Sequence, residues 1–441
     1  MNTVFTKNRF LSIVPLLVFV ITFLGFGIYN EDFYALPSPL AALMGIIVAF
    51  VLFKGTIQNK MDTFLKGCGD GQILTMCIIY LLAGAFAAVS KAAGSVDSIV
   101  NLGMTYISPQ YFAAGIFVIA SFLSFASGTS VGSIVTLGPI VIELAGKSDS
   151  PLGLVGAALL CGAMFGDNLS IISDTTIAVT QSLGCDMKDK FRANFKLALP
   201  AAILALGFFI FAGRNGSPTH IENSNLHFDL LLILPYLIVI ALALKGINVF
   251  VTLFLGLLSA AILGLWNSSF DFLTLSKTTY QGFTDMSEIF YLSLLTGGLA
   301  ALVEKAGGIQ YILSAINRLI FNKKSASVGI GALVCATNLC VANNTIAILI
   351  SGKVAKEIND KYQLEAKNSA SILDIFACYI QGVIPYGAQI LILISLSGFK
   401  IEYVELLLNS YYLHLLLIFT LGFILLRKKP RPIQPIKTTH D

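Results

Sequence analysis

Apolar segments recur along the whole chain, and they constrain its fold more than any other feature. The clearest run over residues 10–28, 72–93 and 195–213. A helix needs about 20 apolar residues to cross a bilayer, and only helices and closed barrels satisfy their backbone hydrogen bonds there. Of the 441 residues, 56% are hydrophobic and only 12% are charged, against about 25% charged in soluble domains. We therefore expect an all-α polytopic membrane protein.

Several apolar windows between residues 111 and 183, and again between 327 and 398, are too short to cross a membrane alone. They are rich in Gly, Ser, Thr and Asn. Irregular backbone is tolerated at membrane depth where it lines protein or water, so these windows favour discontinuous helices or re-entrant hairpins. We predict about 10–13 transmembrane helices in total.

The two halves of the chain resemble each other in sequence. LLAGAFAAVSKAAGSVDSIV (81–100) and LLTGGLAALVEKAGGIQYIL (294–313) are identical at eight of twenty positions. Farther on, SGTSVGSIVT (127–136) aligns with ANNTIAILIS (342–351). We predict two transmembrane repeats, 10–213 and 228–426, joined by a periplasmic linker at 214–229 and followed by a basic cytoplasmic tail at 427–441.

Charges at the first turn of each half differ in sign, which indicates how the halves are oriented. Glu31 and Asp32 follow the first span, whereas Lys245 follows the first span of the second half. Cytoplasmic loops carry an excess of Lys and Arg, so the repeats are predicted to be inverted. Lys7 and Arg9, with the basic tail, then place both termini in the cytoplasm of a bacterial inner membrane. Inverted repeats with interrupted helices are typical of secondary transporters, whose site lies where the repeats meet.

Two acids interrupt the apolar segment CGAMFGDNLSIISDTTIAVTQSLG (161–184). An ionisable group in hydrocarbon costs a few kcal/mol or more and normally marks a functional site. In one continuous helix Asp167 and Asp174 would lie two turns apart on one face; a broken element, or a solvated loop between two spans, is also open. The candidate ion-binding group of this segment is Asp167, Asn168, Ser173, Asp174 and Thr175, with Na⁺ at the two aspartates.

The second half carries neutral polar residues at the equivalent place. Side-chain amides and hydroxyls suit Na⁺, because hard cations take oxygen ligands. For each hydroxyl the alternative is a packing role between close helices. Pro385 is expected to break a helix opposite the Asp167 segment. The second-half candidates are Asn343, Asn344 and Thr345, and a second tier comprises Ser127, Thr129, Ser130, Asn338, Asp374 and Pro385.

Four motifs together resemble the NhaC-type sodium/proton antiporter family. They are SGTSVGS (127–133), FGDNLSIISDTT (165–176), Asn-Asn-Thr (343–345) and the proline of GVIPYG, and with the repeat they span nearly the whole chain. The resemblance implies exchange of Na⁺ for protons, although some similar members carry malate, lactate or amino acids. Val131 stands where many members have tryptophan and Asn168 where many have lysine, so the ion stoichiometry stays open.

We therefore expect a secondary active transporter, not an enzyme, that exchanges Na⁺ for H⁺ by alternating access. Asp174, with Asp167 as its electrostatic partner, is expected to hold either a proton or Na⁺, and this competition couples the two fluxes. The alternative is a Na⁺- or H⁺-coupled transporter of a small carboxylate or amino acid, although no arginine lies deep in an apolar window. We expect no cofactor and no nucleic-acid partner; the partners are Na⁺, H⁺ and the lipid bilayer, and a homodimer is left open.

Overall fold

The computed structural model describes residues 10–30, 32, 34–214 and 227–426, and within these ranges the chain forms helices and no β-strand. Eight helical segments of this part are long and apolar enough to cross a membrane, and four further apolar helices are shorter. The predicted all-α, polytopic class is confirmed. The N-terminal residues 1–9, most of the predicted linker and the predicted tail at 427–441 lie outside the described residues.

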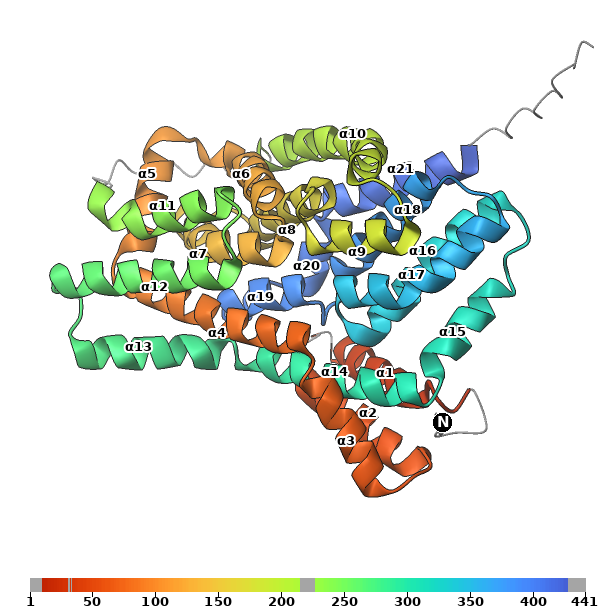
Figure 1. Cartoon of the computed structure of the whole chain (residues 1–441). Helices are drawn as coiled ribbons and strands as arrows, with labels where there is room; N and C mark the ends of the chain where they lie inside the picture. The colour runs from red at the N-terminus through yellow and green to blue at the C-terminus, as the bar shows by residue number, and fades with distance from the viewer. Residues whose placement is uncertain (1–9, 31, 33, 215–226, 427–441) are drawn as a thin grey trace, which may run out of the picture.

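The first half of the chain folds into ten α-helices and a short 3₁₀ turn, all within the described residues (Figure 1). They are α1 (Val14–Tyr29), α2 (Ser38–Leu52), α3 (Ile57–Cys68), α4 (Gly71–Ala92), α5 (Ser95–Tyr106), η1 (Pro109–Tyr111), α6 (Phe112–Ser127), α7 (Ser130–Ser148), α8 (Leu152–Leu169), α9 (Asp174–Leu183) and α10 (Met187–Arg214).

The second half presents its helices in the same order, so that α11 to α19 follow the sequence of α1 to α9. The short helix α20 comes before the last long helix and has no counterpart in the first half. The bounds are α11 (Leu230–Leu244), α12 (Val249–Trp266), α13 (Phe272–Asp285), α14 (Ser287–Lys305), α15 (Gly308–Asn317), α16 (Lys323–Val341), α17 (Asn344–Lys361), α18 (Ala366–Gln381), α19 (Ala388–Leu396), α20 (Tyr403–Leu408) and α21 (Tyr411–Leu426).

Helices of one half pack against helices of the other in matched pairs. α4 lies against α13 and α12, just as α14 lies against α3 and α2. The α4–α13 contact is a close approach of backbones, because a Cβ placed on Gly84 would lie 2.0 Å from the carbonyl oxygen of Gly282. A Cβ placed on Gly67 of α3 would likewise lie only 2.4 Å from the carbonyl oxygen of Gly297 of α14. Small residues permit this proximity. The division into inverted repeats stays a prediction.

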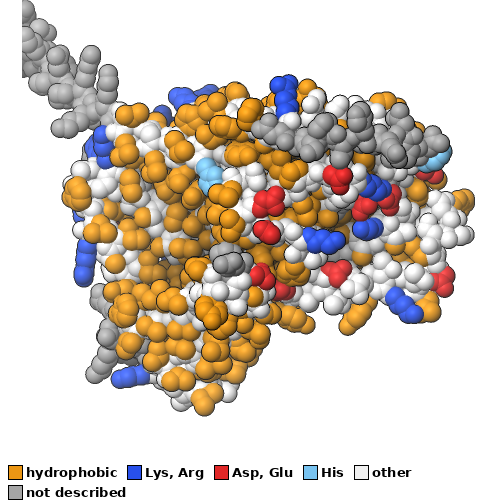
Figure 2. Space-filling view, turned by 180° about the vertical axis from the view of Figure 1, so that it is seen from behind, with side chains coloured by type: hydrophobic (Ala, Val, Ile, Leu, Met, Phe, Trp, Pro, Cys, Tyr) orange, Lys and Arg blue, Asp and Glu red, His pale blue; other side chains and the backbone are white. Residues whose placement is uncertain are grey.

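The outside of the molecule is apolar and its centre is crossed by α8. Ile21, Phe122 and Phe211 expose 65%, 69% and 66% of their surface, and Figure 2 shows hydrophobic side chains over much of one face. Such extended apolar surface marks contact with lipid or protein. α8 is buried along almost its whole length, enclosed by α6, α7, α10 and α21.

Two helical segments are interrupted inside the bundle, as the short windows predict. α8 ends at Leu169 and α9 begins at Asp174, while α18 ends at Gln381 and α19 begins at Ala388. Pro385 lies in the second break, where its missing N–H disturbs no helix. Asp167 and Asp174 therefore belong to different helices, which excludes the alternative of one continuous helix.

Candidate functional site

The Asp167 carboxylate, near the end of α8, is buried and held by two serine hydroxyls. Ser130 Oγ donates to Oδ2 at 2.8 Å, and Ser173 Oγ donates to Oδ1 at 2.5 Å. Thr175 Oγ1 lies 2.9 Å from Ser173 Oγ. Asp167 forms no ion pair with any described residue. The groups in direct contact with its ionised form would therefore be neutral hydroxyl dipoles.

Local sequence explains why Ser130 reaches this position. Gly128 adopts a left-handed conformation with φ of 73° and ends α6, which glycine does without steric cost. Thr129 then caps α7, its Oγ1 accepting from the Gly132 N–H at 3.2 Å. Ser130 is consequently the first residue of α7, at a hairpin tip that faces the end of α8.

A chain of amides connects Asp167 to the second half. Gln389 of α19 donates from Nε2 to Ser130 Oγ at 3.1 Å. Its Oε1 accepts from Gln381 Nε2 at 3.0 Å, and the same Nε2 donates to the Ala342 carbonyl at 3.2 Å. The ends of α16, α18 and α19 are thus joined to Asp167 by continuous hydrogen bonds.

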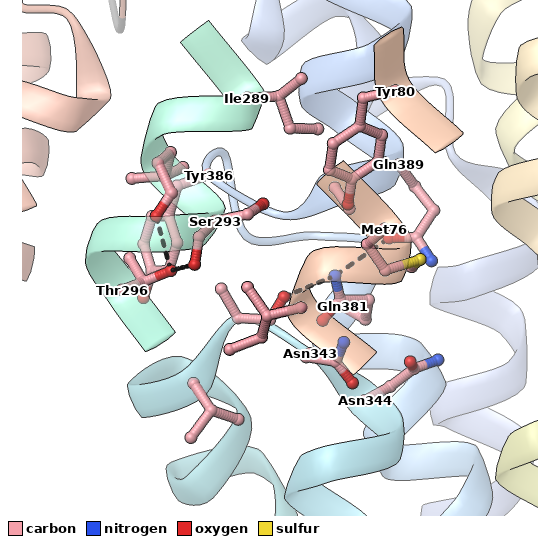
Figure 3. A pocket seen from close by; sticks show the side chains of 15 residues that line it. Met76, Tyr80, Ile289, Ser293, Thr296, Asn343, Asn344, Gln381, Tyr386 and Gln389 are labelled. Carbon is pink, nitrogen blue, oxygen red and sulfur yellow. Dashed lines mark hydrogen bonds between the residues drawn. The ribbon is translucent and has the colours of Figure 1, made fainter. Parts of the chain in front are cut away.

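Both glutamines line a small cavity, together with Asn343 and Asn344 (Figure 3). Its volume is about 30 Å³, which suffices for a water molecule or a cation and little more. Asn343 Oδ1 caps α17 by accepting from the Ile346 N–H at 3.0 Å, and the buried Gln381 Oε1 has no hydrogen-bond partner among the described residues. A cavity lined by amides and lacking a fixed charge suits a small cation.

A buried ion pair lies beside the end of α8. Lys190 Nζ of α10 is 2.7 Å from Asp374 Oδ2 of α18, and both side chains are only 1% exposed. The same ammonium donates to Thr176 Oγ1 at 2.7 Å and to the Asn168 carbonyl at 3.1 Å, so its three protons have three acceptors. Asn194 donates to Asp374 Oδ2 at 2.7 Å and to the Asn168 carbonyl at 2.8 Å. These donors satisfy a carbonyl that the end of α8 leaves free.

The structure distributes the predicted residues over three places. Ser130, Ser173 and Thr175 surround Asp167; Asn168 and Asp374 join the Lys190 cluster, with Asn168 Nδ2 3.1 Å from the Tyr412 hydroxyl; and Asn343 and Asn344 line the cavity, which Thr345 does not. Of the second tier, Asn338 joins α16 to α18 through the Ala377 carbonyl at 3.0 Å, and the buried Ser127 Oγ has no partner in the described part of the chain.

Asp174 differs from its expected surroundings. Its side chain is exposed at the first position of α9, and the hydroxyls that flank it in sequence serve other groups. Ser173 donates to Asp167, and Thr176 Oγ1 donates to the Ser170 carbonyl at 2.7 Å. The expectation that these oxygens gather around Asp174 is therefore corrected: the backbone break at 170–173 turns them inward, toward the end of α8.

Sequence reasoning missed Lys190, Asn194, Gln381 and Gln389. Lys190 stands in the charged stretch MKDKFR, which reads as the solvated start of a helix. A helical period carries the signal, since Lys190 and Asn194 share a stripe with the buried Leu197, Ala198, Ala201 and Ala205. The glutamines are amides within apolar windows, and their position at the two sides of the GVIPYG break marks them as candidates.

Comparison with known proteins identifies the family. The model of the Na⁺/H⁺ antiporter family matches residues 3–214 and 228–427. The chain belongs to this family. The resemblance expected from the motifs is thereby confirmed, and it extends over nearly the whole chain rather than over one motif.

Relatives in the family differ in what their names say they transport. The chain is 26% identical over 425 residues to the malate-2H⁺/Na⁺-lactate antiporter of Bacillus subtilis, covering 88% of each chain. It is 22% identical over 381 residues to the Na⁺/H⁺ antiporter NhaC of Alkalihalophilus pseudofirmus, covering 80% of this chain and 82% of the relative. It is 24% identical over 420 residues to the arginine/ornithine antiporter ArcD of Halobacterium salinarum, covering 86% and 84%. This family member is an antiporter by relationship, with the exchanged solutes still to be assigned.

Proposed function

We propose that this antiporter exchanges Na⁺ for H⁺ across the bacterial inner membrane and that Asp167 is the carboxylate for which the two ions compete. The observation that supports this choice is the environment of Asp167: a buried acid with hydroxyl partners and no described cation in contact. A carboxylate binds either a proton or Na⁺ but not both. Exchange is coupled provided that the empty, charged carboxylate does not cross the membrane.

Charge balance separates Asp167 from the other buried acid. Asp374 is paired with Lys190 at 2.7 Å, so that pair is neutral as a unit. Asp167 has no such partner among the described residues and needs a cation to become neutral. Burying an unpaired charge is costly, so the bound forms of Asp167, with H⁺ or with Na⁺, are the ones favoured to move between the two sides.

The alternative of a carried carboxylate or amino acid has support in the names of two relatives, but not in the size of the cavity that the amides line. Pockets for organic ligands are typically about 300–1,000 Å³, whereas the cavity beside Gln381 and Gln389 measures about 30 Å³. Neither Lys nor Arg lines it. An ion without an organic solute is therefore the better fit.

The distribution of charge supports cytoplasmic termini. Lys323 donates to the Gln363 carbonyl at 3.1 Å and Lys324 to the Leu425 carbonyl, so the α15–α16 and α17–α18 connections lie at the same end as the end of α21. This end is rich in Lys and Arg, as cytoplasmic ends are. At the other end, the Asp229 N–H donates to Ser98 Oγ, and Asp97 pairs with Lys147.

A cysteine at Ser217, in a background without the native cysteines, should react with an impermeant thiol reagent from the periplasm.

The exchange is tested in proteoliposomes that contain a pH-sensitive dye. A Na⁺ gradient should drive proton movement in the wild type without any organic solute. Asp167→Asn should abolish this flux, whereas Asp174→Asn, which removes an exposed acid on the next helix, should retain it within about twofold. Full flux in Asp167→Asn would show that another group carries the exchange. Flux that appears only after malate, lactate or arginine is added would establish the alternative.

A further inference from the structure

A second pocket opens at the basic end of the molecule, between α10, the start of α18 and the end of α21. Its volume is about 360 Å³, far larger than the cavity beside Gln381. Arg192, Lys196 and Lys367 line it, together with the two acids Asp189 and Glu365. We call it the α10–α18 pocket. Nothing in the proposed exchange uses it.

The charges of the α10–α18 pocket leave positive potential available. Arg192 is 3.6 Å from Asp189, and Lys367 is 3.5 Å from Glu365. These pairs are largely exposed and weak. Lys196 forms no ion pair with any described residue. An incoming anion can therefore gain contacts with three cations at little cost.

Two further groups at the pocket favour an anion with several oxygens. α18 begins at Ala366 without a side-chain cap, so its free N–H groups and positive dipole end lie at the pocket. Ser371 lines the pocket, is 2% exposed, and its Oγ has no partner within the described residues. A buried hydroxyl without a partner is unusual, and a phosphate oxygen is the acceptor that it lacks.

The place of the pocket indicates a membrane lipid rather than a dissolved anion. The helices that form its rim face lipid: Phe195 and Ile203 of α10 are 41% and 60% exposed, and Leu426 of α21 is 82% exposed. Phe423 lines the pocket itself. Arg192 and Lys196 lie at the start of α10, directly before its apolar segment. This position at the end of an apolar segment corresponds to the depth of the lipid headgroups. Basic pockets between transmembrane helices at the cytoplasmic face are known binding places of anionic headgroups.

We propose that the α10–α18 pocket binds the phosphate headgroup of an anionic phospholipid. Arg192 and Lys196 contact the phosphate, Ser371 donates to one of its oxygens, and the acyl chains continue along the apolar face of α10. The stripe of α10 that contains Arg192 and Lys196 continues through Leu199 and Ile203, which line an apolar groove of about 270 Å³ against α6 and α8. Headgroup and chain thus have adjacent places on one helix.

Lipid binding is measured on the full chain in phosphatidylcholine vesicles. The single native tryptophan is moved to the pocket by Trp266→Phe with Phe423→Trp, and brominated phosphatidylglycerol or brominated phosphatidylcholine serves as the quencher. We expect phosphatidylglycerol to quench at a much lower fraction of the lipid. Arg192→Gln with Lys196→Gln should raise that fraction by about 30-fold, the factor for two lost cationic contacts.

The matched control is Lys353→Gln with Lys356→Gln, which removes the same charge from the exposed face of α17 outside the pocket. It should leave quenching unchanged. Equal quenching by both lipids, or an equal effect of the two double variants, overturns the proposal. If the tryptophan variant does not fold, the melting temperature in detergent replaces it: phosphatidylglycerol should raise it in the wild type and not in the pocket variant. A rise with inorganic phosphate but not with phosphatidylglycerol assigns the pocket to a free anion and also overturns the proposal.

Discussion

The two interrupted helices of the molecule, α8–α9 and α18–α19, occupy equivalent places in the two halves but differ in charge. The first break follows a buried acid, Asp167, while the position that aligns with it in the second half is Val383. The second break is instead flanked by the neutral amides of Gln381 and Gln389. Within the described residues, the two breaks together therefore contain one buried acid without an ion-pair partner, not two.

This difference teaches how two similar breaks can serve the single ion site that we propose at Asp167. Two unpaired carboxylates near one another would repel and would each need a cation. The second break supplies hydrogen-bonding groups without adding charge, and it reaches Asp167 through Gln389 and Ser130. The first break is further supported by Lys190, which donates to the Asn168 carbonyl. Each of these features can be removed separately.

The largest effect is expected when Lys190 is removed. Lys190→Met leaves Asp374 buried without its partner, which should cost about 3–5 kcal/mol and greatly reduce the yield of folded protein. Removing both charges, with Lys190→Met and Asp374→Leu, should restore much of the loss because no buried charge remains. Melting temperature and gel filtration in detergent measure both variants. A single variant as stable as the wild type would contradict the structural role of the pair.

A smaller effect is expected when the two breaks are disconnected. Gln389→Leu removes the donor to Ser130 and the acceptor for Gln381, while the apolar volume is kept. A lost hydrogen bond of about 1–1.5 kcal/mol should weaken the apparent affinity for Na⁺ by roughly tenfold in the proteoliposome assay. The control is Gln281→Leu, an exposed glutamine of α13 whose Nε2 donates only to Asp285, and it should change nothing. Equal Na⁺ affinities in the Gln389→Leu and Gln281→Leu variants would show that the hydrogen bonds of Gln389 do not contribute to Na⁺ binding.

The cavity amides should have weaker effects again. Asn344→Ala should lower the apparent affinity for Na⁺ a fewfold and affect proton binding less, because an amide oxygen binds Na⁺ and does not titrate. Asn343→Ala should do the same and also lower stability by about 1 kcal/mol, since it removes the cap of α17. Na⁺ titration at two pH values measures both. If neither variant alters Na⁺ affinity, the amides lie outside the ion path.

The smallest effect concerns α20, the helix that only the second half has. Burial raises the pKa of Glu405, and the neighbouring Glu402 raises it further. Because the folded pKa is above the unfolded value, stability is fully present at low pH and is lost as pH rises through the folded pKa. Above neutral pH, Glu405→Gln should therefore raise the melting temperature by a small amount. In acid it should leave the melting temperature unchanged. A gain of equal size at both pH values would exclude the titration as its cause.

The fold was largely predictable because apolar length and internal repetition are properties of sequence. The breaks near Asp167 and Pro385 were also accessible, since acids and prolines within apolar windows have few alternatives. The choice between Asp167 and Asp174 as the proposed ion-binding carboxylate could not be predicted from the sequence. It depends on Ser130, which is distant in sequence and reaches Asp167 only because α6 turns back at Gly128.

Lys190 shows a second limit of sequence reasoning. Its neighbours Lys188, Asp189 and Arg192 are exposed and charged, so local composition predicts a solvated helix start. Burial of Lys190 alone among them results from its acceptors, Asp374, Thr176 and the Asn168 carbonyl. Those acceptors come from three other elements, and no local pattern joins them.

The glycine contacts between the halves have a consequence for how the protein is made. Gly84 of α4 and Gly282 of α13 touch through their backbones, as do Gly67 of α3 and Gly297 of α14. Each partner is about 200 residues away, and a ribosome adding about 5–20 residues per second needs roughly 10–40 seconds to supply it. During that time the glycine faces of α3 and α4 lack the helices that cover them in the folded protein. The first half, released alone, would keep those faces uncovered, so these helices reach their final packing only after α13 and α14 have been synthesised.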